Sequence, residues 1–170
     1  ASEEVARALA LAPQTPVLRL ETVGAADGTA LSRATHWFDA ARFAELPAHC
    51  AQSGSITHAL KACGIGDYKR LSTEISAAPA SRTDREDLGL QAGAVVLLTT
   101  SVNTDQDGVP IQMSRSRFAA DRVTLSGGIT AIANYQWATV DSKFGYLMRH
   151  PTSANQLGDN VSEVVLHSAN

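Results

Sequence analysis

The chain has 170 residues, of which 44% are hydrophobic and 18% are charged, and its formal net charge is −3. This composition predicts one folded globular domain of ordinary size and excludes an intrinsically disordered chain. The acidic balance also argues against a domain that holds DNA by itself. Neutralisation of phosphates by Lys and Arg supplies most of such binding, and the sequence has no basic cluster.

Two further observations bear on location. The longest apolar stretches, such as 94–98, are far too short to span a bilayer, and no segment has the basic and apolar regions of a secretory signal. The two cysteines, Cys50 and Cys63, form neither a CxxC pair nor a disulfide framework. We therefore expect a cytoplasmic protein with reduced thiols and no membrane partner. Because the chain starts inside a predicted helix, we also expect it to be a piece of a longer protein.

The first predicted element is a short helix. Ser2 is a suitable N-cap, and Glu3 and Glu4 follow it at the positive end of the helix dipole. Two β-rich runs come next, separated by Asp27-Gly28, which is the strongest short signal for a β-hairpin. This part of the chain therefore predicts the order helix, strand, turn and strand.

The middle of the chain is predicted to be helical. Residues 40–50 favour one short helix or two turns, interrupted at Pro47. Ser55 is the expected N-cap of another helix, whose apolar residues recur at helical spacing as far as Cys63, and Gly64 ends it. A further strand is predicted at 70–77.

The first unit then recurs. Ser81 is predicted to cap a helix, and Asp107-Gly108 separates two more β-rich runs. Residues 88–122 match residues 9–42 at an offset of 79 that becomes 80 at the turn, and the matching pairs include Leu9 with Leu88, Val17 with Val96, Asp27 with Asp107, Phe38 with Phe118 and Arg42 with Arg122. We predict an internally duplicated helix–hairpin unit, with the two hairpins related by a pseudo-two-fold axis in one antiparallel sheet with flanking helices. The fold class is α+β.

The order and spacing of these segments resemble a known family. The segments that carry the likeness are 17–22, the first Asp-Gly turn, 36–40, Gly54-Ser55-Ile56, 70–77 and 112–123. Together they are similar to the UTRA domain, the effector-binding part of HutC-subfamily regulators in the GntR family. Within that group, the likeness is greatest to the regulators of phosphonate metabolism, the PhnF type. It covers about residues 1–126.

The resemblance implies a chorismate-lyase-like fold and a homodimer. It also implies that an N-terminal winged helix-turn-helix, absent from this chain, makes the contact with DNA. A small effector would then shift the arrangement of the DNA-reading parts, which requires different affinities for two states. We expect a ligand-sensing domain at 1–126 and a C-terminal extension at 127–170, to which we assign no function.

Four residues near the end of the second unit alternate along one face of a predicted strand. They are Gln112, Ser114, Ser116 and Phe118, whereas Ile111 and Met113 are predicted to take the other face. Small hydrogen-bonding side chains that end in an aromatic ring favour a polar pocket, and the alternative is a row that faces water. The resemblance implies ligand contacts at the positions of Gln112 and Phe118.

Other candidates point to an anionic ligand. A helix that starts at Ser55 offers free N–H groups to an anion, with the hydroxyls of Ser55 and Thr57 beside them; the alternative is that Ser55 is only a cap. The resemblance implies ligand binding at Ser55 and at Arg19, although Arg19 also suits an ion pair with Glu21. Arg70 is a third candidate, because a guanidinium matches phosphate or phosphonate oxygens bidentately.

No catalytic or metal-binding motif is recognisable. The sequence lacks a GxSxG elbow, a phosphate-binding loop and a dinucleotide fingerprint, and its histidines do not have zinc-site spacing. We therefore predict a small-molecule sensor without metal or cofactor, and not an enzyme. Two alternatives remain open: a lyase on the same fold, and a dimerisation module that binds no ligand.

Overall fold

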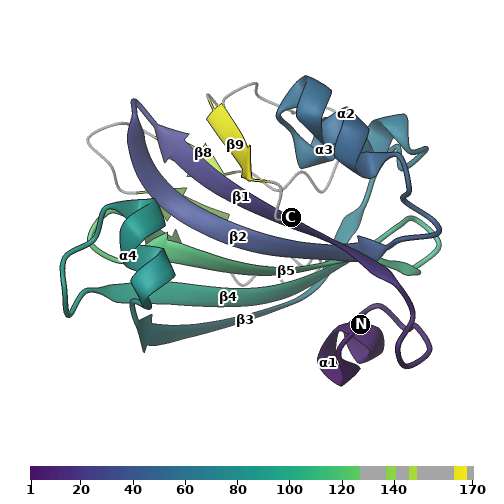
Figure 1. The fold of residues 1–170 in the computed structure, drawn as a ribbon, viewed down its shortest axis with the longest axis horizontal. Helices are drawn as coiled ribbons and strands as arrows, with labels where there is room; N and C mark the ends of the chain where they lie inside the picture. Colours follow the sequence, from purple (N-terminus) through teal and green to yellow (C-terminus); the bar gives the residue numbers. More distant parts are fainter. Residues whose placement is uncertain (127–136, 141–145, 149–162, 168–170) are drawn as a thin grey trace.

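The computed structural model describes residues 1–126, 137–140, 146–148 and 163–167 (Figure 1). Within these residues, the main element is an antiparallel sheet of six strands in the order β3-β4-β5-β2-β1-β9. Its strands are β1 (Val17–Ala26), β2 (Thr29–Asp39), β3 (Lys69–Pro79), β4 (Val95–Thr104), β5 (Pro110–Ala119) and β9 (Glu163–His167). A smaller sheet contains β6 (Thr124–Ser126), β7 (Trp137–Val140) and β8 (Tyr146–Met148). The rest of the predicted extension at 127–170 lies outside the described residues.

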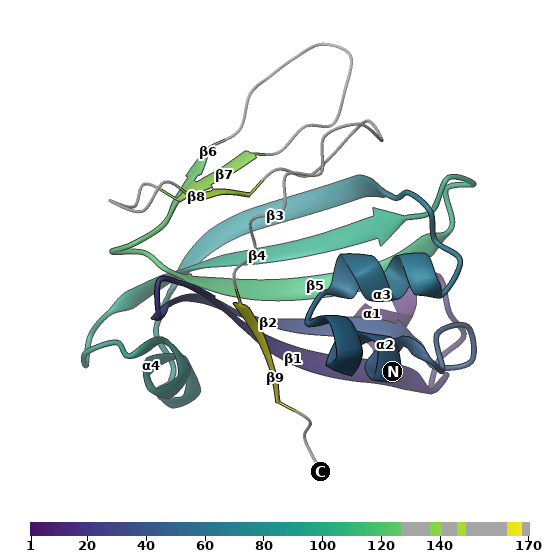
Figure 2. The ribbon, with the colours of Figure 1, turned by 90° about the horizontal axis from the view of Figure 1, so that it is seen from above.

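Four helices flank the main sheet in the described part of the chain: α1 (Glu3–Ala8), α2 (Leu46–Ser53), α3 (Ile56–Ala62) and α4 (Arg82–Leu88). Figures 1 and 2 show α2 and α3 on one side of the sheet and α1 on the other side at the same end, whereas α4 lies at the opposite end. This architecture confirms the predicted α+β class.

The register of the strands decides which side chains share a face. Leu20 pairs with His36, and His36 pairs with Ser114, so these residues lie on the face that α2 and α3 cover. We call this the α2–α3 face. On the opposite face, Trp37 and Met113 contact residues of α1, and α4 also packs there. We call this the α1–α4 face.

The predicted pseudo-two-fold relation is confirmed. The strands β2 and β5 come from the two copies and lie next to each other in the centre of the sheet. Thr35 pairs with Arg115, and Arg115 is also the residue that corresponds to Thr35 in the second copy, at an offset of 80. The pseudo-two-fold axis therefore passes through this pair. The symmetry extends to the loops. Arg42 binds Asp105 beside the second Asp-Gly turn at 2.6 Å, and its equivalent Arg122 donates to the carbonyl of Ala30 beside the first turn at 2.7 Å.

Local sequence signals explain the helix ends. Ser2, Ser55 and Ser81 each accept a hydrogen bond from a backbone N–H in the first turn of the following helix, as predicted for N-caps. The helix expected at 40–50 begins later, at Leu46, because Pro47 is tolerated only in the first turn. It runs on to Ser53 and ends at Gly54, which has the left-handed conformation that glycine adopts without strain.

Apolar clusters pack on both faces of the sheet. On the α2–α3 face, one cluster lies under the two helices and contains Phe38, Phe43, Leu46, Cys50, Ala59, Leu60, Ile65 and Ile111. A second cluster on this face, at the other end of the strands, contains Ala26, Leu31, Phe118 and Val123. Phe38 and Phe118 are equivalent in the duplication, so each copy contributes one phenylalanine, although each cluster also contains residues of the other copy. The part of the face between them is polar.

Candidate functional site

Five polar side chains meet on the α2–α3 face, between its two apolar clusters. They are Thr22, His36, Asn103, Gln112 and Ser114, which we call the polar centre. Four of them are buried, with exposed fractions of 3–8%, and His36 is partly buried. The helix-covered face of an antiparallel sheet is normally apolar, so a buried polar group there needs a specific reason. The polar centre is therefore the candidate functional site.

His36 is the hub of this hydrogen-bond network. Its Nε2 lies 3.1 Å from Thr22 Oγ1, and its Nδ1 lies 2.9 Å from Ser114 Oγ and 3.0 Å from Gln112 Nε2. The amide nitrogen of Gln112 can only donate, so His36 Nδ1 accepts. His36 Nε2 then carries the proton and donates it to Thr22. This arrangement requires a neutral imidazole.

The electrostatics of the site agree with a neutral His36. Burial of the ring, together with the positive charge of Arg70, lowers the pKa of His36 from 6.5 to about 4. Both effects disfavour the imidazolium form. At neutral pH the polar centre therefore consists of uncharged hydrogen-bonding groups, and none of its five side chains is a carboxylate.

Arg70 brings positive charge to the edge of the polar centre. It lies on β3 and pairs across the sheet with Asn103 on β4, so the two side chains share the α2–α3 face. Burial lowers the pKa of Arg70 and the neighbouring Tyr68 acts in the opposite direction, but a guanidinium stays charged in proteins. Tyr68 Oη in turn lies 3.2 Å from Thr57 Oγ1 on α3. This contact connects the start of α3 to the neighbourhood of Arg70.

The predicted site residues on β5 divide into two groups. Gln112 and Ser114 belong to the polar centre, and Ser116 lies on the same face, opposite Thr99. Phe118 shares that face but belongs to an apolar cluster. The expectation that Ile111 shares a face with Met113 is wrong. The pairing of β4 with β5 shifts register beside Ile111, and this irregularity lets Ile111 pack under α2 and α3.

Arg19 does not join the other predicted residues. It pairs with Trp37, so it lies on the α1–α4 face, opposite to Ser55 and Gln112. Its side chain is 56% exposed and forms an ion pair with Glu21. The prediction that Arg19 lines one pocket with Ser55, Thr57 and Gln112 is therefore wrong. On β1, Thr22 is the residue that contributes to the polar centre.

Ser55 has the role of a helix cap. Its Oγ accepts the backbone N–H of His58 at 3.3 Å, and its residue is partly exposed at the start of α3. Binding of an anion at this position is neither supported nor contradicted by that contact. That Ser55 and Thr57 contact a ligand stays a prediction.

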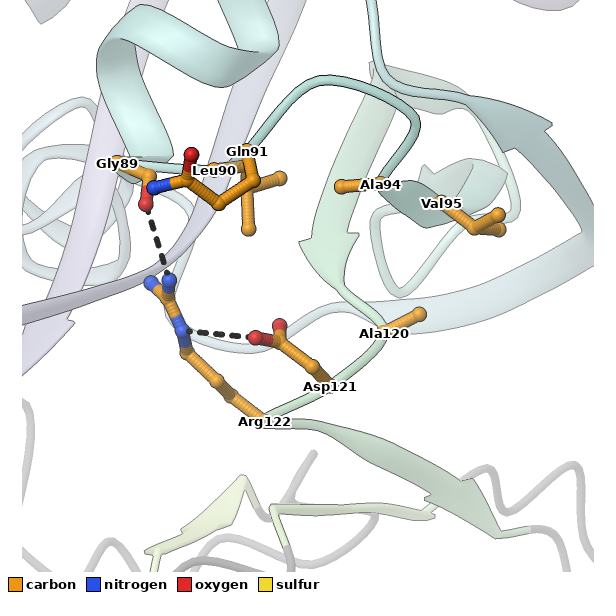
Figure 3. A pocket seen from close by; sticks show the side chains of 8 residues that line it. All are labelled: Gly89, Leu90, Gln91, Ala94, Val95, Ala120, Asp121 and Arg122. Atoms are coloured by element: carbon orange, nitrogen blue, oxygen red, sulfur yellow. Dashed lines mark hydrogen bonds and ion pairs between the residues drawn. The ribbon is translucent and has the colours of Figure 1, made fainter.

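A separate cavity of about 470 Å³ lies at the opposite end of the sheet (Figure 3). It is lined by Gly89, Leu90, Gln91, Ala94, Val95, Ala120, Asp121 and Arg122. None of the predicted binding residues is among them. Its main charged group, Arg122, already donates to the carbonyl oxygens of Ala30, Leu88 and Gly89. This arginine has a structural role, which weakens the case for a ligand there.

Three members of the polar centre were not predicted from the sequence: Thr22, His36 and Asn103. Their strands contain several other polar residues, so the sequence gives only a weak signal for these three. The signal becomes specific only once the register places His36 opposite Ser114 and Asn103 opposite Gln112.

No group of three or more His, Cys, Asp or Glu side chains among the described residues is arranged to hold a metal ion. No helix in the described part of the chain is long and apolar enough to cross a membrane.

The low pKa of His36 predicts a pH-dependent stability. An unfolded chain takes up a proton at this histidine below about pH 6.5, whereas the folded chain does so only near pH 4. The stabilisation from neutral His36 is therefore complete above pH 6.5. It is lost as the pH falls towards 4, by up to roughly 2–3 kcal/mol in the free energy of unfolding.

Urea unfolding at several values between pH 7 and pH 4.5 measures this effect. The His36→Gln variant should lose less stability than the wild type over that interval. The exposed His58 provides the control, and His58→Gln should keep the wild-type slope. Equal slopes for the wild type and His36→Gln would show that His36 is not the group responsible.

The sequence of this region is similar to known proteins. The family described as the UTRA domain matches residues 1–124. The chain is 48% identical over 125 residues to the uncharacterized HTH-type transcriptional regulator RB1450 of Rhizobium meliloti (strain 1021). It is 30% identical over 126 residues to the HTH-type transcriptional repressor PhnF of Mycolicibacterium smegmatis. Each match covers 74% of this chain and 51% of the relative, so the chain spans about half the length of these relatives.

Solved structures give the same result. PhnF from Mycobacterium smegmatis superposes with a TM-score of 0.71 at 29% identity, over 77% of this chain and 58% of that chain. The effector domain of the same protein gives 0.68 at 27% identity, over 77% of this chain and 80% of that one. A GntR-family regulator from Enterococcus faecalis V583 gives 0.63 at 20% identity, over 76% and 92%. The last of these shows likeness of fold alone.

Proposed function

This chain belongs to the UTRA domain family, and we propose that it is the effector-binding part of a bacterial transcription regulator of the GntR family, HutC subfamily. The names of its relatives support this, since both are HTH-type transcriptional proteins and a matching structure is called an effector domain. Those relatives are about twice as long as the matched segment. We propose that DNA is contacted by another part of the regulator, because this chain carries a net charge of −3.

The proposed effector is a small anion, a phosphonate or a phosphate ester. The observation that carries the proposal is the position of Arg70 beside a buried cluster of uncharged hydrogen-bonding groups. A guanidinium forms strong charge-assisted hydrogen bonds with phosphate and phosphonate oxygens. A polar centre without carboxylates adds no repulsion. The likeness to PhnF gives further support for a phosphonate.

We propose that Arg70, Gln112, Ser114 and Ser116 contact this effector, with Ser55 and Thr57 at the start of α3 and with Phe118 as the apolar border. Binding at this place would act on α3, which packs on the same face as the polar centre. The effector would change DNA binding only if it has different affinities for two arrangements of the regulator. We also propose that the regulator is a cytoplasmic homodimer and not an enzyme.

The experiment is calorimetric titration of the chain with alkylphosphonates, phosphate monoesters and amino-sugar phosphates. Charge-assisted hydrogen bonds contribute roughly 1.5–3 kcal/mol each, so Arg70→Met should weaken binding of the best ligand about ten-fold or more. Arg19→Met is the matched control, because it removes an arginine from the opposite face, and it should leave the affinity within about two-fold.

The reverse result, in which Arg19→Met abolishes binding and Arg70→Met does not, would place the site on the α1–α4 face. Product formation from chorismate would instead favour the lyase alternative. Circular dichroism of both variants checks that they fold.

A further inference from the structure

The polar centre ends in a buried oxygen atom that lacks a hydrogen bond. Asn103 is only 3% exposed, and its amide nitrogen donates to Gln112 Oε1 at 2.7 Å. Its carbonyl oxygen, Oδ1, has no hydrogen-bond partner among the described residues. Most buried polar atoms in proteins are paired, and leaving such an acceptor without a donor is costly. The atom is therefore suited to a donor that a ligand supplies.

The direction of the hydrogen bonds determines what Asn103 presents. Gln112 donates to His36 Nδ1, and its carbonyl oxygen accepts from Asn103. In this row of three residues, each amide turns its nitrogen towards His36, and the carbonyl oxygen of Asn103 stands at the far end of the row. The reverse direction would need a proton on His36 Nδ1, and Asn103 would then present its nitrogen. The direction of the hydrogen bonds in this row therefore decides whether Asn103 needs a hydrogen-bond donor or an acceptor from the ligand.

The place of Asn103 beside Arg70 allows one small ligand to contact both residues. The two residues are direct partners across the β3–β4 pair, where Cα atoms are about 4.5–5.5 Å apart. Because the two side chains start from neighbouring positions on one face, a small ligand can contact both, with its anionic group on the guanidinium and its hydrogen-bond donor on Asn103 Oδ1. The smallest ligands of this kind carry the two groups on a one- or two-carbon skeleton.

We propose that Asn103 Oδ1 accepts a hydrogen bond from the effector, so that the effector is a small anion carrying a hydroxyl or amino group close to its phosphonate or phosphate. This inference rests on the proposed function and makes it narrower: an anion without a donor would leave Asn103 Oδ1 buried and unpaired. Such a ligand should bind about ten-fold more weakly.

The test uses three phosphonates of nearly equal size. Hydroxymethylphosphonate and aminomethylphosphonate carry a donor one carbon from the phosphorus, and ethylphosphonate has a methyl group in its place. In calorimetric titrations of the wild-type chain, both donor-bearing ligands should bind about ten-fold more tightly than ethylphosphonate. In Asn103→Leu, which keeps the side-chain volume and removes the acceptor, this difference should disappear.

Thr100→Val is the control variant, because Thr100 lies on the same strand and on the opposite face. It should keep the ten-fold difference. Equal affinities of the wild type for all three ligands would overturn the inference while leaving the anionic site intact. That comparison needs no variant, so it decides the matter even if Asn103→Leu is unstable. Absence of binding by all three would overturn the proposed phosphonate site itself, and this inference with it.

Discussion

Replacing Asp84 with alanine should lower the free energy of unfolding by about 3–5 kcal/mol, because the change removes a buried carboxylate that pairs with two arginines. Arg33 keeps its ion pairs with Glu21 and Asp87, whereas Arg117 loses the one ion pair it has among the described residues. Asp84 is 1% exposed. Its carboxylate accepts from Arg33 at 3.2 Å and lies 3.4 Å from Arg117, and these contacts hold α4 against the α1–α4 face. It also accepts from the backbone and hydroxyl of Ser81 in a capping box. One substitution therefore removes the carboxylate half of a capping box and two ion pairs.

The pKa of Asp84 gives an independent check. Burial raises this pKa, but the hydrogen bonds from Ser81 and Arg33 and the charge of Arg117 outweigh burial and lower it below its usual value. The stabilisation is therefore present at neutral pH and is lost as the pH falls through the folded-state pKa. Urea unfolding at pH 7 measures the main effect. Glu86→Gln on the same helix is the control, because its exposed ion pair with Arg82 should contribute less than about 1 kcal/mol. Similar losses for both variants would contradict the central role of Asp84.

Replacing Phe38 with alanine should cost about 3–5 kcal/mol by opening a cavity under α2 and α3. Phe38 is fully buried, and its ring meets Phe43 edge-on at 5.9 Å between centroids. It also borders His36, at 6.5 Å between ring centroids. The loss should therefore weaken both the packing of the two helices and the support of the polar centre.

Denaturant unfolding followed by far-UV circular dichroism measures this change. Leu71→Ala on the edge strand β3 is the control, since that side chain is 58% exposed and its loss should be nearly neutral. The equivalent variant Phe118→Ala tests the second apolar cluster. A small effect of Phe38→Ala, close to that of Leu71→Ala, would show that the cluster under α2 and α3 does not stabilise the fold.

The polar centre shows why only part of the site was predictable. Gln112, Ser114 and Ser116 were found because they alternate along one strand, and alternation is visible in sequence. His36 and Asn103 were not, because each is only one of several polar residues in its own strand. Their meaning depends on the partner strands, which bring His36 to Ser114 and Asn103 to Gln112.

The sequence by itself determined the features that depend on neighbouring residues. The serine caps, the Asp-Gly turns and the duplicated unit are local patterns, and together they were enough for the α+β class and the UTRA family. Only the tertiary structure decided which face of the sheet each residue shares with the helices. Arg19 and Ser55 were expected in one pocket, but the register of β1 against β2 puts Arg19 on the opposite face. Alternation along a strand shows which of its residues share a face, but it does not show which face of the sheet α3 will cover. Packing between distant segments makes that choice.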